Sequence, residues 1–526
     1  MRQITYTLAP EIALDTTLFE AYVRQDLKIS ADAPCFIRQA KRSIDARKAP
    51  VKVVVETQVF ENEPIKERVS YQRSYPNVAG AAQAIVVGAG PAGMFAALRL
   101  IELGIKPILI ERGKDVKNRT EDIANISRRH LVNPESNYCF GEGGAGTYSD
   151  GKLYTRSKKR GDWRRILEIF VAHGASEDIL VEAHPHIGTN KLPRIVAEIR
   201  KSIIEAGGEV HFNTKVIDLI LDQEEAKGVV LESGEKIKGI GIILATGHSA
   251  RDIFELLDRK KIEIEAKPFA LGVRIEHRQS LIDSIQYHRP ERGLLPAASY
   301  ALVEQVAFKG QEKGVFSFCM CPGGFIVPSA TEAGEVVVNG MSPSRRNSKY
   351  ANSGIVVAVE PADLYKLEKP YQTFGNLAAL RFQQDIERKA CALAGGTQAA
   401  PAQLMVDFVE KRLSQSLLDT SYQPGLVSVK MDEVLPAFIA ERLRKGFIAF
   451  GRKMKGYLTN EAQIVGVESR TSSPVRIPRE AQSREHTQIK RLFPSGEGAG
   501  YAGGIASAAI DGERCAEMLV ALYAKK

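Results

Sequence analysis

The chain has 526 residues, with 72 Lys and Arg against 63 Asp and Glu, so its formal net charge at neutral pH is +9. Hydrophobic residues make up 44% and charged residues 26% of the sequence, a composition that excludes a largely disordered, fibrous or membrane-embedded chain. Six scattered cysteines are too few for a disulfide framework and favour a reducing compartment, so we expect a cytoplasmic protein. No apolar signal core or membrane-spanning segment is visible, so no membrane partner is expected.

The first eighty residues predict a small α+β domain followed by a linker. Alternating apolar residues at 3–8 predict a strand, and the stretch 18–27 predicts a helix. Apolar runs around residue 36 and at 51–60 predict further strands. The polar segment 62–80 contains turn residues and little periodicity, which is typical of a linker.

From residue 84 the pattern alternates between strand and helix, which predicts a parallel α/β domain. The first unit is a strand at 84–87, a helix at 91–103 and a strand ending at residue 110. A second predicted helix runs from 192 to 206, and short strands follow it as far as 244. The stretch 268–360 is β-rich, the stretch 374–457 is helical, and a last helix is predicted at 505–523.

The segment 88–93, GAGPAG, lies between the first strand and its helix and predicts a dinucleotide site. Gly88 permits the tight turn, Gly90 lets the backbone approach a pyrophosphate, and Gly93 lets helix and strand pack closely. The free N–H groups of the helix N-terminus favour the phosphates. Glu111 ends the next strand, where a carboxylate can accept hydrogen bonds from ribose hydroxyls.

Three further Gly-rich segments favour FAD over NAD, because FAD is long and needs more backbone contacts than one β-α-β unit provides. They are GEGGAGT at 141–147, ATG at 245–247 and GEGAG with two more glycines at 496–504. Each segment alone is more often a plain tight turn. All of them together, in this order, favour FAD. The predicted FAD contacts are Gly88, Gly90, Pro91, Ala92, Gly93, Glu111, Arg112, Gly143, Gly144, Thr147, Val216, Ala245, Thr246, Gly247, Gly496, Glu497, Gly503, Gly504 and Ile505.

Longer motifs resemble a known bacterial family. They are GAGPAG with ERG at 111–113, GEGGAGTYSDGKL at 141–153, ATG, PFALGVRIEH at 268–277, FCMCPGGFIVPSA at 318–330, GEGAGYAGGIASAAIDG at 496–512, and SIDAR at 43–47. The sequence resembles the FAD-dependent dehydrogenases (NAD/FAD-utilising dehydrogenases) of the glutathione-reductase-like flavoprotein superfamily. The resemblance implies a two-dinucleotide-type FAD fold with an N-terminal appendage and an inserted domain, and it implies no substrate.

A second GxGxxG unit, which holds NAD(P)H in glutathione-reductase-type enzymes, is absent between residues 250 and 491. We therefore expect no permanently docked pyridine nucleotide. NAD(P)H stays open as a transient reductant of the flavin.

Cys319 and Cys321 form a CxC pair beside a Pro-Gly-Gly turn. Their spacing closes a strained ring, unlike the CxxC pairs of disulfide reductases, so packing is the favoured role and redox activity the alternative. Four thiolates at zinc spacing do not occur, and no metal site is predicted.

Two histidines are candidates for proton transfer, since reduction of an unsaturated substrate by hydride requires a proton donor. His186 lies in a His-Pro-His loop before a helix, and His248 follows ATG directly. For His186, a helix-capping or structural role is the commoner one. Arg274 and Arg346 could bind a carboxylate, although salt bridges are the commoner role.

Basic residues gather between 152 and 165, opposed only by Asp162. Such a run is usually a solvated face, but with the positive net charge it also permits an anionic partner such as RNA. The region lacks the interleaved aromatic residues that stack on bases. Nucleic acid is therefore the alternative partner, after a small-molecule substrate, and the sequence sets no oligomeric state.

These observations predict an α/β fold: a Rossmann-like FAD-binding domain with an inserted β-rich and helical substrate domain and a small α+β N-terminal domain. The expected limits are 1–80 for the N-terminal domain and linker, 81–265 and 481–526 for the FAD-binding domain, and 266–480 for the insert. The predicted function is an FAD-dependent oxidoreductase that transfers hydride or electrons between FAD and an unidentified organic substrate. The alternative is an RNA-interacting flavoprotein that acts in tRNA modification.

Overall fold

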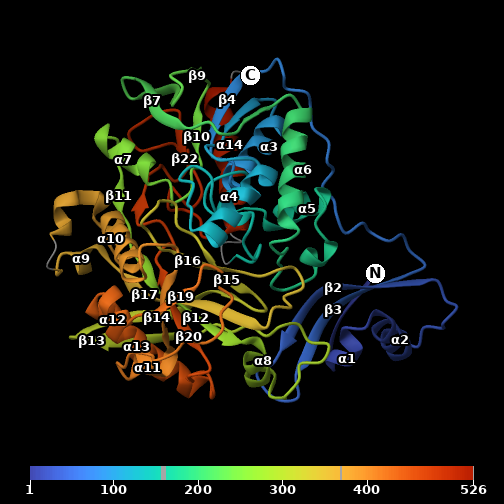
Figure 1. Ribbon diagram of the computed structural model, residues 1–526. Helices are drawn as coiled ribbons and strands as arrows, with labels where there is room; N and C mark the ends of the chain where they lie inside the picture. Colours follow the sequence, from blue (N-terminus) through green and yellow to red (C-terminus); the bar gives the residue numbers. More distant parts are fainter. Residues whose placement is uncertain (156–160, 368–369, 525–526) are drawn as a thin grey trace.

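The structure is a computed structural model that describes residues 1–155, 161–367 and 370–524. Figure 1 shows an α/β domain at the top, a sheet covered by helices at the lower left, and the N-terminal domain projecting at the lower right. The chain passes from the N-terminal domain through the α/β domain into the sheet domain and returns to the α/β domain at its end.

The N-terminal domain is the predicted β-α-β-β unit. Its antiparallel sheet has the strand order β1-β3-β2, and two helices pack on it around Tyr6, Phe19 and Val23. The elements are β1 (Arg2–Leu8), α1 (Pro10–Ala13), α2 (Thr16–Asp26), β2 (Cys35–Asp45) and β3 (Lys52–Glu61). No helix or strand forms between residues 62 and 82, all of which the structure describes. This linker is held by Glu168, which accepts hydrogen bonds from the N–H groups of Ser70 and Tyr71.

A five-stranded parallel sheet forms the centre of the α/β domain, with the order β22-β10-β4-β5-β6. These strands are β4 (Gln83–Val87), β5 (Lys106–Ile110), β6 (Glu209–His211), β10 (Ile242–Leu244) and β22 (Leu492–Pro494). Because all five strands are parallel, their carboxyl ends lie at one edge, where open α/β sheets bind ligands.

Each face of this sheet has its own core, because side chains alternate along the strands. In β4, Ala84 and Val86 face one set of helices, and Ile85 and Val87 face the other side. The first face is covered by α3 (Pro91–Glu102), α5 (Trp163–Ala172), α6 (Leu192–Glu205) and α14 (Ile505–Tyr523). The second is covered by α7 (Arg251–Arg259) and the three-stranded sheet β7 (Val216–Asp222), β8 (Glu225–Leu231) and β9 (Lys236–Lys238).

The insert contains a seven-stranded sheet with the order β13-β14-β17-β12-β20-β18-β19. The strands are β12 (Phe269–Arg278), β13 (Val303–Phe308), β14 (Gln311–Cys321), β17 (Tyr350–Val359), β18 (Ala400–Leu404), β19 (Leu426–Ser428) and β20 (Gln463–Glu468). A separate hairpin joins β15 (Phe325–Pro328) to β16 (Val338–Met341). The helices are α8 (Gln279–Tyr287), α9 (Pro361–Leu364), α10 (Ala378–Leu393), α11 (Met405–Val409), α12 (Met431–Val434) and α13 (Ala437–Lys453).

The β-rich and helical parts of the insert form one body with one core. Phe382 of α10 and Phe447 of α13 belong to the same buried cluster as Ile355 of β17. Two short strands, β18 and β19, interrupt the stretch that the sequence predicts as helical. The chain leaves and re-enters the α/β domain through the paired strands β11 (Glu265–Ala266) and β21 (Val475–Arg476). Both lie close to the predicted limits at 265 and 480, which stay predictions.

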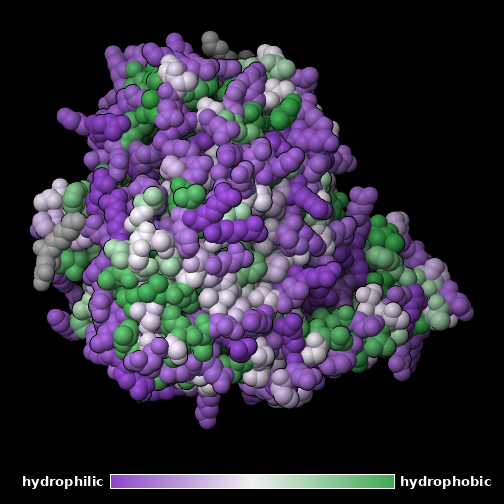
Figure 2. Space-filling model, in the orientation of Figure 1, coloured by the Kyte–Doolittle hydropathy of each residue, from purple (hydrophilic) through white to green (hydrophobic). Residues whose placement is uncertain are grey.

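The face shown in Figure 2 is mostly hydrophilic, with apolar areas over the helices of the insert and over the N-terminal domain. Among residues 1–155, 161–367 and 370–524, no helix is both long and apolar enough to cross a bilayer.

Candidate functional site

A cavity of about 550 Å³ lies at the carboxyl edge of the parallel sheet. It brings together the four Gly-rich segments, which are spread over residues 88–504, and residues of the insert. The predicted site residues that line it are Gly88, Gly90, Pro91, Ala92, Glu111, Arg112, Gly144, Val216, Ala245, Thr246, Gly247, His248, Gly496, Glu497, Gly503, Gly504 and Ile505.

Three predicted contacts lie behind the cavity wall and shape it. A side chain on Gly93 would collide with the Gly88 carbonyl, so this glycine lets α3 pack on the turn. Gly143 has a φ of +75°, and a side chain there would collide with the hydroxyl of Thr147. Thr147 donates that hydroxyl to the Glu142 carbonyl at 2.7 Å. Gly143 and Thr147 therefore stabilise the fold of the loop, and Gly144 lines the cavity.

Gly88 and Gly90 have different roles in the turn before α3. Gly88 has a φ of +103° and packs against the backbone of Ala245, so β4 and β10 end side by side. At Gly90, the nearest atom to an added Cβ is the Gly144 Cα at 3.9 Å, and the remaining space is the cavity. A phosphate fits this opening. The N–H groups in the first turn of α3 have no acceptor within the helix, so they are free to donate hydrogen bonds to an anion bound there.

Glu111 holds the cavity wall through three backbone hydrogen bonds. Its carboxylate accepts from the N–H groups of Ala89 at 2.8 Å, Gly113 at 2.9 Å and Gly141 at 2.9 Å. These bonds join the first Gly-rich turn to the second. A carboxylate has about four acceptor positions, so one remains for a ribose hydroxyl. The structure thus gives Glu111 a structural role in addition to the predicted ribose contact.

Arg112 orients an aromatic ring at the same end of the cavity. Its guanidinium pairs with Glu135 at 2.6 Å and Asp252 at 2.9 Å, and it lies 4.5 Å from the centre of the Phe140 ring. Phe140 lines the cavity. Because the charge of Arg112 is neutralised by two carboxylates, its contribution is to hold this ring in place.

The other end of the cavity is formed by the loop before α14. An added Cβ on Gly503 would meet no atom within 4 Å, so open space surrounds this glycine. Asp511 of α14 accepts the Gly496 N–H at 2.8 Å and pairs with Arg479 at 2.6 Å. This contact fixes the start of α14 relative to β22, and the helix presents its N-terminus to the cavity.

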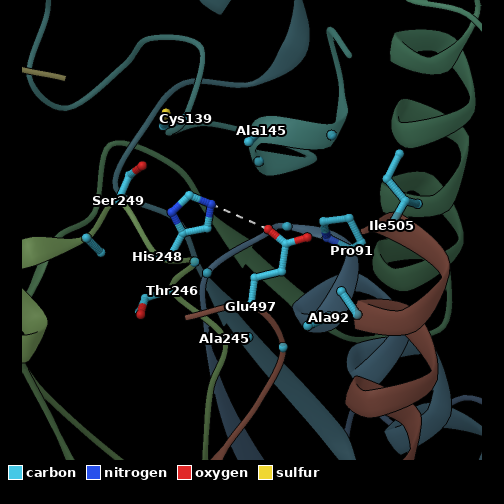
Figure 3. Close-up of a pocket in the computed structure, with 18 of the residues that line it drawn as sticks. Pro91, Ala92, Cys139, Ala145, Ala245, Thr246, His248, Ser249, Glu497 and Ile505 are labelled. Carbon is cyan, nitrogen blue, oxygen red and sulfur yellow. Dashed lines mark ion pairs between the residues drawn. The ribbon is translucent and has the colours of Figure 1, made fainter. Parts of the chain in front are cut away.

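His248 points toward Glu497 across the cavity, as Figure 3 shows. The His248 Nε2 lies 3.6 Å from the Glu497 Oε2. Burial, together with the charges of Arg470 and Arg251, lowers the pKa of His248 to about 4. Burial also raises the pKa of the Glu497 carboxyl. Both shifts favour the neutral groups, so a neutral imidazole faces a carboxyl group that holds its proton more tightly than usual.

Models of known families match three parts of the chain. Residues 1–60 match a domain of unknown function, residues 81–136 match an FAD binding domain, and residues 268–471 match the C-terminal domain-like region of FAD-dependent proteins. An uncharacterized protein of Clostridium beijerinckii is 40% identical over 528 residues, which cover 96% of each chain. The chain belongs to a family of FAD-dependent oxidoreductases. FAD is its cofactor.

More distant proteins are also similar to this oxidoreductase. A thiamine thiazole synthase of Aeropyrum pernix is 27% identical over 195 residues, 34% of this chain and 59% of that protein. A solved flavin-dependent brominase is 13% identical with a TM-score of 0.37, over 85% of this chain and 80% of its own.

The cavity of the oxidoreductase fits FAD in its residues as well as in its position. Gly90 leaves room for the pyrophosphate, Glu111 and Phe140 lie at the adenosine end, and Gly503 leaves room at the opposite end. Gly90, Glu111 and Gly503, which the sequence pattern singles out, all line this cavity. The pattern did not reveal Phe140, Asn339 or Arg470, which line the same cavity and belong to no Gly-rich motif.

His186, the first sequence candidate for proton transfer, does not line the cavity. Its Nε2 lies 3.2 Å from the Ser344 carbonyl, and burial together with Arg346 lowers its pKa. It lies behind Asp150, a lining residue that pairs with Arg346 at 2.9 Å. Of the two histidines, only His248 lines the cavity, and His186 makes a structural contact.

A buried ion network joins the insert to the α/β domain beneath the cavity. Arg470, which lines the cavity, pairs with Glu387 at 2.8 Å and Glu335 at 3.0 Å. Arg251 of α7 pairs with the same two carboxylates at 2.8 and 3.1 Å. Each buried charge has partners of opposite sign, which its desolvation requires. The network fixes the two domains around the cavity, and no local sequence pattern signals it.

Several other residues that the sequence offers as binding candidates form ion pairs within the protein. Arg274 pairs with Glu468 in the interior of the insert. In the basic region, Arg164 pairs with Glu168 and Arg165 with Glu102 and Glu513. Residues 156–160 of that region lie outside the described part of the chain. Where residues are described, no group of three or more His, Cys, Asp or Glu side chains could hold a metal ion.

Proposed function

We propose that this FAD-dependent oxidoreductase is a dehydrogenase that transfers hydride or electrons between FAD and a small organic substrate. The observation that carries the proposal is the composition of the cavity wall. Besides residues of the α/β domain, side chains of the insert line the cavity, namely Phe318, Cys319, Asn339, Arg470, Thr471 and Ser472. A substrate there would lie between the cofactor domain and the insert.

Bound FAD supplies a centre that accepts or donates two electrons with a proton. The chain supplies the surroundings of that transfer. The loop before α14 and the helix N-terminus favour negative charge at the flavin end. His248 and Glu497, 3.6 Å apart, supply a proton donor and acceptor to a substrate atom. The buried network of Arg251, Arg470, Glu335 and Glu387 closes the far side of the cavity.

Replacing His248 with glutamine should lower the rate of substrate turnover roughly 100-fold or more, because a positioned acid or base contributes about that much. FAD content should stay unchanged, since the substitution removes the titrating ring without adding bulk. The measurement is anaerobic flavin reduction by candidate organic donors, and reoxidation by unsaturated acceptors, in both proteins. His186→Gln is the matched control and should keep the wild-type rate. An equal rate in the His248 and wild-type proteins would remove His248 from the mechanism.

We also propose that no site for a permanently bound pyridine nucleotide exists, which departs from the glutathione-reductase plan. NADH and NADPH should then bind with a Kd of roughly hundreds of micromolar or weaker and reduce the flavin slowly. Stopped-flow absorption at increasing nucleotide concentration measures both quantities. Fast, tight reduction by either nucleotide alone would require a dedicated site in this chain.

We propose a cytoplasmic location for the protein, because of the state of its cysteines. All six cysteines are free thiols, which a reducing compartment preserves.

A further inference from the structure

Two thiols and an ammonium group form a cluster at the flavin end of the cavity. The Lys152 Nζ lies 3.6 Å from the Sγ of Cys319 and 3.6 Å from the Sγ of Cys321. It also donates a hydrogen bond to the Met320 carbonyl between them. Cys319 is exposed and lines the cavity, whereas Cys321 is buried behind it. The packing role favoured from the sequence therefore suits only Cys321.

The backbone turns the CxC pair toward this ammonium. The pairing of β14 with β17 is interrupted between Phe318 and Cys321, and Cys319 has a φ of +48°. The Arg274 Nη2 fixes the bulge by donating to the Cys319 carbonyl at 2.7 Å. The Cys321 thiol lies 3.2 Å from the same carbonyl. A regular strand would continue past Lys152, and the bulge instead presents both sulfur atoms to one cation.

The cluster lies where the flavin end is expected. Lys152 follows the second Gly-rich loop, in which Gly146 packs against Ile505 at the start of α14. Cys319 is also near enough to Glu497 to raise the pKa of that carboxyl. The cavity at this point is thus bounded by α14, Glu497 and Cys319.

We infer that Cys319 and Cys321 are a redox pair that exchanges two electrons with FAD, so that the enzyme also acts on disulfide or dithiol substrates. The inference needs FAD in the cavity and goes beyond the proposed function, because it needs no other organic substrate. In one direction, the Cys319 thiolate and the Cys321 thiol lose two electrons and one proton and form a disulfide. Bound FAD would accept those two electrons and that proton.

The reverse step breaks the Cys319–Cys321 bond with the same two electrons and returns a thiolate and a thiol. A substrate disulfide then regenerates the pair by thiol–disulfide exchange, in which two substrate thiols leave. The small ring of a CxC disulfide makes its bond easier to reduce, which favours the transfer of two electrons from reduced flavin to the pair.

The surrounding charges assign different states to the two sulfur atoms. Hydrogen bonding to Cys321 and the positive charges of Lys152 and Arg274 hold the pKa of Cys319 well below its usual range. The pKa of Cys321 is raised by the hydrogen bond to Cys319 and by burial. The charged or titratable groups that face the pair are Asp150, Lys152, Arg274, Tyr300, Glu468 and Glu497. Cys319 is therefore the thiolate and Cys321 the protonated partner.

Electron counting tests the inference on the wild-type protein as purified with FAD. After oxidation with diamide and removal of the reagent, anaerobic titration with dithionite should consume four electrons per FAD. Cys319→Ser and Cys321→Ser should each consume two. Cys35→Ser, which removes a thiol of the N-terminal domain, should still consume four. Two electrons per FAD in the wild-type protein would overturn the inference without bearing on the proposed dehydrogenase.

Absorption gives a second readout that does not depend on a disulfide. A thiolate beside oxidised flavin should give a band at longer wavelength than the flavin itself, present in wild type and Cys321→Ser and absent in Cys319→Ser. Lys152→Met should raise the pH at which the band forms, and Lys152→Arg should restore it. Absence of the band from the dithiol form of wild type across the pH range would also contradict the inference, because Cys319 would not face the flavin as a thiolate.

Discussion

Replacing Gly90 with valine should abolish FAD binding while the chain stays folded. The backbone of Gly90 is extended, with a φ of −75° and a ψ of −178°, which valine adopts readily. Its side chain would enter the cavity at the place assigned to the pyrophosphate, since the nearest protein atom is 3.9 Å from the added Cβ. We expect affinity to fall about 100-fold or more. Flavin fluorescence titration of the apoprotein measures this loss, and circular dichroism checks the fold.

Gly80→Val is the matched control for this substitution. Gly80 has no atom within 4 Å of an added Cβ, and it lies in the linker before β4, outside the cavity. This variant should bind FAD as the wild type does. Gly503→Val tests the opposite end, where a side chain would occupy the open space before α14. Normal FAD affinity in both cavity variants would show that FAD does not pass between these two glycines.

Replacing Glu111 with alanine should weaken FAD binding tenfold or more and also lower the free energy of unfolding. Three backbone N–H groups lose their acceptor, and a hydrogen bond to a charged group is worth about 1.5 to 3 kcal/mol. The Gly-rich turn and the loop at 141–147 would then no longer be held together. Isothermal titration with FAD and chemical denaturation of the apoprotein measure the two effects separately.

Glu111→Gln separates the ribose contact from the structural one. Glutamine keeps an acceptor for part of the backbone network but loses the charge, so its effects should lie between those of wild type and alanine. Unchanged FAD affinity and unchanged stability in the alanine variant would contradict both roles of this carboxylate.

The sequence predicts the cofactor half of the site well, because its signals are local. The strand, turn and helix around GAGPAG follow from a short apolar run, three glycines and a proline at the first helical position. The last helix is predicted at 505–523 and found there, since its small apolar residues follow directly on the glycines. Glu111 directly follows β5, the second strand of the β-α-β unit, as the sequence predicts.

Other parts of the structure have no short sequence pattern that would predict them. The helix α4 (Val116–Arg129) buries Arg119 and Asp122 on its inner face, so it lacks the apolar periodicity that predicts a helix. The network of Arg251, Glu335, Glu387 and Arg470 pairs residues that are 83 to 136 positions apart. Lys152 reaches the CxC pair across nearly 170 positions. These contacts depend on how the domains pack, which no short pattern encodes.

The histidines illustrate the same limit. From the sequence both histidines are candidates, His186 in a rigid loop before a predicted helix and His248 directly after ATG at a predicted strand end. Only His248 follows a strand at the carboxyl edge of the parallel sheet, and only this histidine lines the cavity. Sheet order decides between them, because β10 lies next to β4 and its end therefore meets the cofactor turn.

The central claim is that four Gly-rich segments form one cavity that holds FAD without a covalent bond. The most direct test is to purify the protein, denature it, and identify the released flavin by chromatography, with its amount compared to that of the chain. The account predicts a yellow protein that releases one FAD per chain and leaves no flavin on the polypeptide. Release of FMN, flavin that stays attached to the chain, or no flavin even after incubation with FAD would contradict it.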